Sequence, residues 1–449
     1  MTRVLVPSGA LGLNYDKVAL QRGLDMNPDI IAVDGGSTDS GPAYLGQGVS
    51  KYSRASTKLE WAGLMEARAQ AGVPLVIGTA GTCGTDDTVD WMFDITKEIA
   101  AELGQKVKVA LLYSSQDPKV IAAQMDQIIP LPGAKEVSVG DIETCENIVA
   151  LAGAEQVQAA INTGADIIIA GRTTDTAIIA ALPLQNGDHA GAAWHGAKIG
   201  ECGALCATNP QSGVIIVEFD KTGFTIVPLA DGAHASPHTV SAHMLYENSD
   251  PFILTEPGGV LDVTDASYQA LDETRVRVEG SEWKVADVYT VKLEGARQEG
   301  FQTAMLSLIR NPDYVAHAQK WAADIHEKCS AKVMDRLGLG ADAFSITLHV
   351  IGQNATLGAL ETKTGTAPEA GVLGVVTAQS EDIVAEISKM LDPYMLHHPL
   401  TKEEEQPTFA FPFSPAAIPR GKIFGFCLHH VLPLADPMDA FRLEVHELG

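Results

Sequence analysis

Short apolar runs alternate with longer stretches of helical periodicity through the first half of the chain. Each run is apolar almost throughout, as expected for a parallel strand that is covered on both faces. The predicted strands are RVLV at 3–6, IIAV at 30–33, PLVI at 74–77, VKVALLY at 107–113 and DIIIA at 166–170. The segments between them are long enough for crossover helices. This alternation predicts an α/β fold with a doubly wound, mostly parallel sheet.

The pattern changes near residue 214. The segments GVIIVEFD and GFTIVPLAD predict a β-hairpin around residues 220–223. From about residue 285 the order strand, helix, strand, strand, helix predicts a smaller α+β layer. We therefore expect a parallel α/β domain with glycine-rich loops over 1–213, a β-rich connecting segment over 214–284, and a second, smaller α+β domain over 285–449.

Charge and composition narrow the expected partners and location. The net charge of −26 argues against nucleic acid and against an anionic membrane surface as partners. No apolar stretch approaches the ~20 residues that cross a bilayer, and the start MTRVLVPSGALG is typical of a strand and turn rather than a signal peptide. Six cysteines are too few for a disulfide scaffold and suit a reducing compartment. We expect a cytoplasmic protein.

A turn rich in glycine or small polar residues follows each of the five predicted strands. The turns are PSGALG, DGGSTDSGP, GTAGTCGTDD, YSSQD and GRTTDT. In a parallel sheet such turns meet at the carboxyl edge, where open α/β sheets bind their ligands. This edge is therefore the expected position of a site.

The third of these turns, in VIGTAGTCGTDDTVDW at 76–91, has glycines at a three-residue spacing. It lacks the lysine of a phosphate-binding P-loop, and its spacing differs from the dinucleotide fingerprint. Two interpretations remain: tight packing of a strand against an acid-capped helix, or binding of a substrate carboxylate or carbonyl by amides and hydroxyls. On the second interpretation the binding residues are Gly78, Thr79, Gly81 and Thr82.

The turn after the second strand carries two carboxylates, Asp34 and Asp39, with Gly36 and Ser37 between them. Carboxylates with water are the ligands that a hard cation such as Mg²⁺ prefers, so a divalent cation is possible here. The alternative is an Asx turn with solvated acids. No other cofactor is evident, and Gly36 and Ser37 are candidate substrate-binding residues.

The turn after the fifth strand places Arg172 directly behind an apolar run. A guanidinium binds a carboxylate or phosphate through two parallel hydrogen bonds, which favours a site for an organic acid or a CoA phosphate. Thr173 is a second candidate binding residue. The alternative is a structural ion pair between Arg172 and Asp175.

The segment WHGAKIGECGALCA at 194–207 gathers further ionisable side chains. The spacing of Cys202 and Cys206 matches structural zinc sites poorly. Glu201 and Cys202 are therefore interpreted as acid/base residues, since proton transfer requires one group within reach of the substrate. Asp175 is expected to orient a partner, and Cys206 to be apolar packing.

Several motifs, in order, resemble the acyclic terpene utilisation protein family. They are GRTTDT, ECGA, LYENSDPFILTEPGGVLDV, FAFPFSP and LHHVLPLADPMDAFRLE, and the likeness covers most of the chain. The matching positions are Gly171, Arg172, Asp175 and residues 201–203, whereas ECGALCATNP departs from the expected Ala-Thr-Gly-Gly-like continuation. The resemblance implies catabolism of branched terpenoid acids as CoA thioesters, with a possible small partner subunit.

Together these features predict a catabolic enzyme that moves protons on a small organic acid or its CoA thioester. Hydration, dehydration or isomerisation is favoured over redox chemistry, because no nicotinamide or flavin fingerprint is present. We expect an anionic small-molecule substrate and a homo- or hetero-oligomer. The alternative is a non-catalytic scaffold or substrate-binding subunit of a hetero-oligomeric enzyme.

Overall fold

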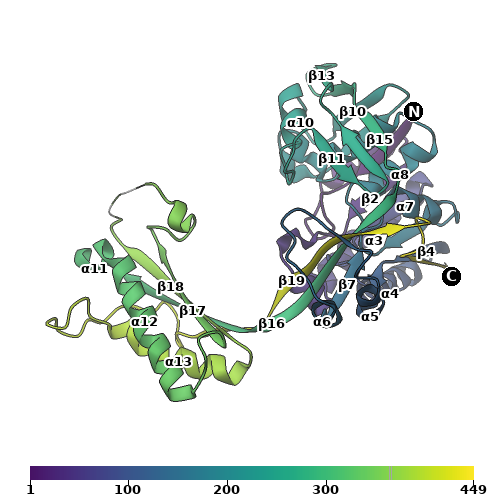
Figure 1. Cartoon of the computed structure of the whole chain (residues 1–449). Helices are drawn as coiled ribbons and strands as arrows, with labels where there is room; N and C mark the ends of the chain where they lie inside the picture. Colours follow the sequence, from purple (N-terminus) through teal and green to yellow (C-terminus); the bar gives the residue numbers. More distant parts are fainter. Residues whose placement is uncertain (364, 366) are drawn as a thin grey trace. The chain divides into compact units, whose positions relative to one another are not determined.

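The computed structural model describes residues 1–363, 365 and 367–449 (Figure 1). The chain forms two compact units. Unit 1 consists of Met1–Arg297 and Gly425–Gly449, and unit 2 consists of Gln298–Phe424. The division into segments 1–213, 214–284 and 285–449 that the sequence suggested stays a prediction. No helix in the described ranges is long and apolar enough to cross a membrane.

Unit 1 is built on a ten-stranded mixed sheet. From edge to edge its strands are β13 (Ser267–Ala270), β14 (Val276–Glu279), β10 (Gly223–Pro228), β9 (Ile215–Phe219), β1 (Thr2–Val6), β2 (Ile30–Asp34), β3 (Leu75–Gly78), β8 (Ile167–Ala170), β4 (Val107–Tyr113) and β20 (Arg442–Leu448). The five consecutive strands β1, β2, β3, β8 and β4 are parallel. They are the five strands expected from the apolar runs.

Antiparallel strands extend this parallel centre at both edges. β9 pairs with β1 on one side, and β20 pairs with β4 on the other. The predicted hairpin is confirmed as β9 and β10, which turn at Asp220. The chain is thus a mixed α/β protein, and the expectation of a mostly parallel, doubly wound sheet is not confirmed. Periodicity finds strands but does not reveal that later segments of the chain join the sheet in the opposite direction.

Helices pack on both faces of the parallel centre because consecutive strand residues point to opposite sides. Leu5, Ile31 and Ile77 belong to one core, with helices α1 (Lys17–Asp25), α3 (Arg54–Ala71) and α4 (Asp86–Leu103). Their neighbours along the strands belong to a second core, with helices α7 (Ala154–Ile161), α8 (Ala177–Gln185) and α9 (Ala190–Gly200). Both faces are therefore apolar, which explains the uninterrupted runs in the sequence.

Shorter elements complete unit 1. They are η1 (Thr38–Ser40), α2 (Ala43–Gln47), β5 (Ser115–Gln116), α5 (Pro118–Ala123), β6 (Ile129–Pro130), α6 (Val139–Glu143), β7 (Asn147–Ala150), η2 (Gly203–Cys206), η3 (Pro210–Ser212) and α10 (Pro237–His243). A separate three-stranded sheet contains β11 (Ile253–Glu256), β12 (Gly259–Asp262) and β15 (Glu282–Val285).

Unit 2 packs helices against an antiparallel sheet. Two long strands, β16 (Tyr289–Ile309) and β19 (Ile418–Leu434), contribute residues to both units. Within unit 2, β16 pairs with β18 (Ala370–Ala378), which pairs with β17 (Phe344–Ile351). The helices are α11 (Pro312–Ala316), α12 (Ala318–Leu337), η4 (Gly358–Leu360) and α13 (Glu381–His397). β16, α12, β17, β18 and α13 follow the strand and helix order expected from the sequence.

The turns after the five parallel strands meet at one edge of the sheet. The amide of Leu11 donates to the carbonyl of Asp34, Gly35 donates to Gly78, and Thr79 donates to Gly171. The amide of Gly171 in turn donates to the carbonyl of Leu112 in β4. Adjacent turns are thus joined through their backbones, as the parallel order of the strands requires.

Candidate functional site

A cavity of about 910 Å³ opens in unit 1 beside this edge of the sheet. Its volume is in the range of small-molecule sites. The walls come from the turns after β1 and β2, from residues 202–213 and from Tyr246 and Glu247, with Thr82 and Asp175 reaching in from the turns after β3 and β8. Residues from four of the five expected turns therefore line the cavity.

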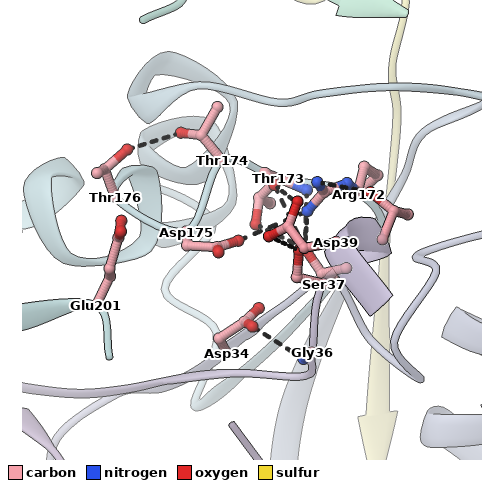
Figure 2. Close-up of polar contacts among 12 residues, drawn as sticks. Asp34, Gly36, Ser37, Asp39, Arg172, Thr173, Thr174, Asp175, Thr176 and Glu201 are labelled. Atoms are coloured by element: carbon pink, nitrogen blue, oxygen red, sulfur yellow. Dashed lines mark hydrogen bonds and ion pairs between the residues drawn. The ribbon is translucent and has the colours of Figure 1, made fainter. Parts of the chain in front are cut away.

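Asp34 ends β2 and lies deep in the cavity, with 5% of its surface exposed. Its Oδ2 accepts a hydrogen bond of 2.9 Å from the amide of Gly36 (Figure 2), while its Oδ1 is buried and has no hydrogen-bond partner. Burial raises the pKa of Asp34 well above the usual value, and the nearby charge of Asp175 raises it further. The carboxyl group is thus favoured in its protonated form.

Asp175, from the turn after β8, is the second inner carboxyl group of the cavity. Its Oδ1 is also buried without a hydrogen bond, although it lies 3.5 Å from Nη1 of Arg172. Burial raises the pKa of Asp175 to about 6, against the opposing effect of Arg172. Asp34 and Asp175 thus both line the cavity, and each has one buried oxygen without a hydrogen bond. The negative charge of Asp175 also raises the pKa of Asp34.

Arg172 lies beside Asp175, is buried, and is held by protein groups (Figure 2). Its Nε donates to Glu294 over 3.1 Å, and its two terminal nitrogens donate to Thr79, Thr38 and the carbonyl of Thr173. The side chain is 6% exposed and does not line the cavity. The guanidinium thus has a structural ion pair, and its role as the binder of a substrate anion stays a prediction.

Glu294 of β16 completes the buried ion pair. Its Oε2 also accepts a hydrogen bond of 2.9 Å from Thr38, and its Oε1 lies 2.8 Å from Nζ of Lys292. Burial alone would raise the pKa of Glu294, but Arg172 and Lys292 outweigh it and hold the pKa at about 2. This network joins the turns after β2 and β8 to β16. No sequence signal marked Glu294, because it lies 122 residues from Arg172 along the chain.

The glycines of the 78–84 turn approach the protein rather than the cavity. A Cβ on Gly78 would lie 2.4 Å from the Thr173 hydroxyl, and one on Gly84 would lie 2.3 Å from the amide nitrogen of Arg172. Thr79 and Gly81 are also outside the cavity lining, whereas Thr82 belongs to it. The interpretation as tight packing therefore describes most of this turn, and the helix does begin after Thr85 with two acids in its first turn.

Some of the remaining residues predicted from the sequence line the cavity, and the others belong to a layer of buried residues outside its lining. Gly36, Ser37 and Cys202 line the cavity, whereas Thr173 and Glu201 do not. Glu201 is buried and paired with Lys198, and burial raises its pKa to about 8. The charge of Asp175 contributes to that shift.

Glu256 was missed by the sequence analysis although it lies in this same buried layer. Its Oε1 accepts a hydrogen bond of 2.7 Å from Thr176, and its Oε2 has no hydrogen-bond partner. Burial raises the pKa of Glu256 to about 7. The family-like string LYENSDPFILTEPGG contained it, but nothing in that string pointed to a carboxyl group directed at residues 174–176.

The possible cation ligands Asp34 and Asp39 both line the cavity. Asp39 accepts a hydrogen bond from the Ser37 hydroxyl, and its amide donates one back to that oxygen, as expected of a polar turn. Across the described part of the chain, no three side chains of the His, Cys, Asp and Glu types are grouped so as to hold a metal ion. A Mg²⁺ ion bound by one or two carboxylates stays a prediction.

Strained backbone is concentrated around the cavity. Six non-glycine residues in the described ranges have positive φ, and four of them line the cavity: Asn14, Thr82, Asn209 and Glu247. A side chain in this conformation costs about 1–3 kcal/mol and persists where the surrounding structure enforces it. Such residues cluster at binding and catalytic sites, which supports this cavity as the functional site.

The family comparison agrees with the motifs read from the sequence. Residues 62–423 match the model of the acyclic terpene utilisation family protein AtuA. The chain belongs to this family. The match spans the turns after β3 and β8 and the cavity wall at 202–213, and confirms the resemblance. No curated protein and no solved structure matches the chain.

In this AtuA family chain the environment of Cys202 favours a neutral thiol. Burial and the nearby charge of Glu201 raise its pKa, whereas the interaction with the Cys145 thiol lowers the pKa of Cys427. Both Cys202 and Cys427 are partly exposed, while Cys206 is fully buried. Cys202 is thus better suited to donate a proton than to act as a nucleophile.

Iodoacetamide is therefore expected to modify Cys427 before Cys202 at neutral pH, and Cys206 last. The thiolate is the reacting form, so the order follows the pKa values and the exposure. Mass-spectrometric peptide mapping over a time course gives the three rates. Faster labelling at Cys202 than at Cys427 would contradict this assignment and indicate that Cys202 is the more reactive thiol.

Proposed function

We propose that this protein is a cytoplasmic catabolic enzyme that transfers protons on a small organic acid or its CoA thioester. The observation that carries the proposal is that Asp34 and Asp175 both line the cavity, and that each has one buried oxygen without a hydrogen-bond partner. Paired carboxyl groups in different environments are a common basis of general acid–base catalysis. Hydration, dehydration and isomerisation can all use such a pair.

The two carboxyl groups suit opposite roles. Asp175 has a pKa of about 6 and lies beside Arg172, so it is ionised at neutral pH and can accept a proton. Asp34 is the more buried of the two, and the charge of Asp175 further favours its protonated form. Asp34 is therefore the proton donor. The neutral thiol of Cys202 lines the same cavity and can donate a hydrogen bond to a substrate oxygen.

The buried layer behind Asp175 supports this assignment. Lys198 forms an ion pair with Glu201. The charge of Lys198 lowers the pKa of Asp175, and the charge of Asp175 raises the pKa of Glu201. Because Lys198 stabilises the ionised form of Asp175, this layer helps to keep the proposed base deprotonated. Glu201 thus acts in the proposal as a positioning residue rather than as the group that contacts substrate.

Deuterium exchange tests the proposal directly. The chain alone is incubated in D₂O with a panel of short branched carboxylic acids and their CoA thioesters, and incorporation at the carbon next to the carbonyl is followed by NMR. We expect exchange with at least one class. Its rate should rise as the pH increases through about 6, where Asp175 loses its proton, and fall at higher pH as Asp34 loses its own.

Two outcomes would contradict the proposal. Exchange with no member of the panel over the whole pH range would remove the support for proton transfer. Exchange that appears only after a co-purified protein is added would support the alternative, a substrate-binding or scaffold subunit that completes a partner's site.

A further inference from the structure

The cavity is rich in carboxylates, which raises the question of how it would hold an anionic substrate. Five acidic residues line it: Asp16, Asp34, Asp39, Asp175 and Glu247. Among the lining residues that the structure describes, Lys51 is the sole cation. Arg172, the cation expected from the sequence, is occupied by Glu294 and three threonines and does not reach the cavity.

Two of the outer acids are satisfied within their own turns. Asp16 caps α1 and accepts hydrogen bonds from the amides of Val18 and Ala19. Asp39 accepts a hydrogen bond from the Ser37 hydroxyl. These charges are thus compensated locally, and they require no ligand.

Lys51, unlike these two acids, has no hydrogen bond or ion pair to its charged group in the described part of the chain. Its Nζ lies 5.8 Å from the centre of the Tyr52 ring. The side chain is exposed, so it lies at the outer part of a cavity whose inner end holds the buried Asp34. A strongly hydrated point charge in this position can bind an incoming anion without breaking a hydrogen bond or an ion pair.

The backbone around Lys51 is held by the site itself. Its amide donates a hydrogen bond of 3.2 Å to the hydroxyl of Thr82, one of the strained cavity residues. The neighbouring Tyr52 ring packs over Gly12, where a Cβ would lie only 2.4 Å from the ring. The ammonium is therefore carried on a positioned backbone, although its own side chain is free to move.

We propose that Lys51 binds the anionic group of the substrate and so sets its orientation in the cavity. This inference rests on the proposed function. The anion stays at the outer end with Lys51, while the neutral carbonyl or hydroxyl part reaches Asp34 and Asp175. The shared ligand chemistry is an anionic oxygen, which is either the carboxylate of a free acid or a phosphate of CoA.

Binding measurements on the full chain test this inference without relying on catalysis. The probes are 3-methylbutanoate, CoA, and 3-methylbutylamine, which matches the acid in shape but carries the opposite charge. Isothermal titration is carried out on the wild type, Lys51→Ala, Lys51→Arg, and the control Lys135→Ala. Lys135 is an exposed lysine of unit 1 outside the cavity lining, and its replacement makes the same change in net charge.

We expect the wild type to bind one of the two anionic probes, and the identity of that probe distinguishes a free acid from a CoA thioester. Lys51→Ala should weaken its binding about tenfold, as for loss of a hydrogen bond to a charged group. Lys51→Arg should retain most of the affinity, because the charge is kept, and Lys135→Ala should bind as the wild type does.

Three results would overturn the inference. They are unchanged affinity in Lys51→Ala, an equal loss in Lys135→Ala, and a wild type that binds the amine but neither anion. Each can occur while deuterium exchange still depends on Asp34 and Asp175, in which case the proposed function stands and only the role of Lys51 is wrong. If deuterium exchange is absent but anion binding still depends on Lys51, the role of Lys51 stands and the proposed function is wrong.

Discussion

Replacement of Asp34 or Asp175 by asparagine is expected to lower the exchange rate by about 10²–10⁴-fold, the usual contribution of a general acid or base. Asparagine keeps the size of the side chain but neither accepts nor releases a proton in this range. Each variant should also lose one limb of the pH profile: the rise near pH 6 in Asp175→Asn, and the fall at higher pH in Asp34→Asn. Loss of a specific limb distinguishes a catalytic role from a general disturbance.

Stability measurements show whether these variants remain folded. The pKa of Asp34 is raised in the folded chain, so folding favours its protonated form and the wild type loses stability as the pH rises from the usual carboxyl range to that raised value. Asp34→Asn should lack this loss and be at least as stable at neutral pH in urea unfolding. Asp126→Asn, at an exposed residue outside the cavity lining, is the matched control and should exchange like the wild type. Full activity in both site variants would exclude the proposed pair.

Replacement of one partner in the Arg172–Glu294 pair is expected to lower the free energy of unfolding by about 3–5 kcal/mol, the usual cost of leaving a buried charge without its partner. Both side chains are 6% exposed, and their network links three segments distant in sequence. Glu294→Gln removes one charge at nearly constant shape and should show this full loss. Arg172→Lys keeps its charge but loses the planar fork that reaches Thr38, Thr79 and Glu294, so its loss should be smaller. Urea unfolding of the full chain measures the change.

Two controls separate this structural role from the binding role that the sequence suggested for Arg172. Arg275→Lys changes an arginine whose ion pair with Asp272 is largely exposed, and it should shift stability by about 1 kcal/mol or less. The double variant Arg172→Met, Glu294→Met should be less destabilised than the sum of its single changes, because neither charge is then left alone. If Arg172→Lys instead unfolds like the wild type but no longer binds an anionic probe, the arginine is a substrate residue after all.

The two predictions describe two layers of one site. The Arg172–Glu294 pair holds the turns after β2 and β8 in place, and the carboxyl groups carried by those turns face the cavity. Arg172 also opposes the raised pKa of Asp175, so the structural pair adjusts the proposed base. A change at Arg172 is therefore expected to move the limb near pH 6 upward in any variant that remains folded, because a cation that stabilises the carboxylate has been weakened.

Local chemistry determined much of the fold. The five parallel strands, the hairpin at Asp220 and the helix that begins after Thr85 all followed from periodicity, turn residues and caps, which act within a few residues. The meeting of the turns at one edge also followed, because parallel strands leave no other arrangement. The sequence thus predicted a site at this edge, and Asp34, Ser37, Asp175 and Cys202 line the cavity beside it.

Tertiary structure decided which of the candidates faces the cavity. Arg172 and Asp175 are three residues apart in the same turn, yet one is held by a glutamate 122 residues away and the other lines the cavity. The sequence of the turn does not show which of the two side chains is paired. The difference arises from β16, which brings Glu294 to the turns after β2 and β8. Lys51 could not be singled out for the same reason: a lysine becomes notable only when the surrounding cavity contains carboxylates and no other cation, and distant segments of the chain provide that surrounding.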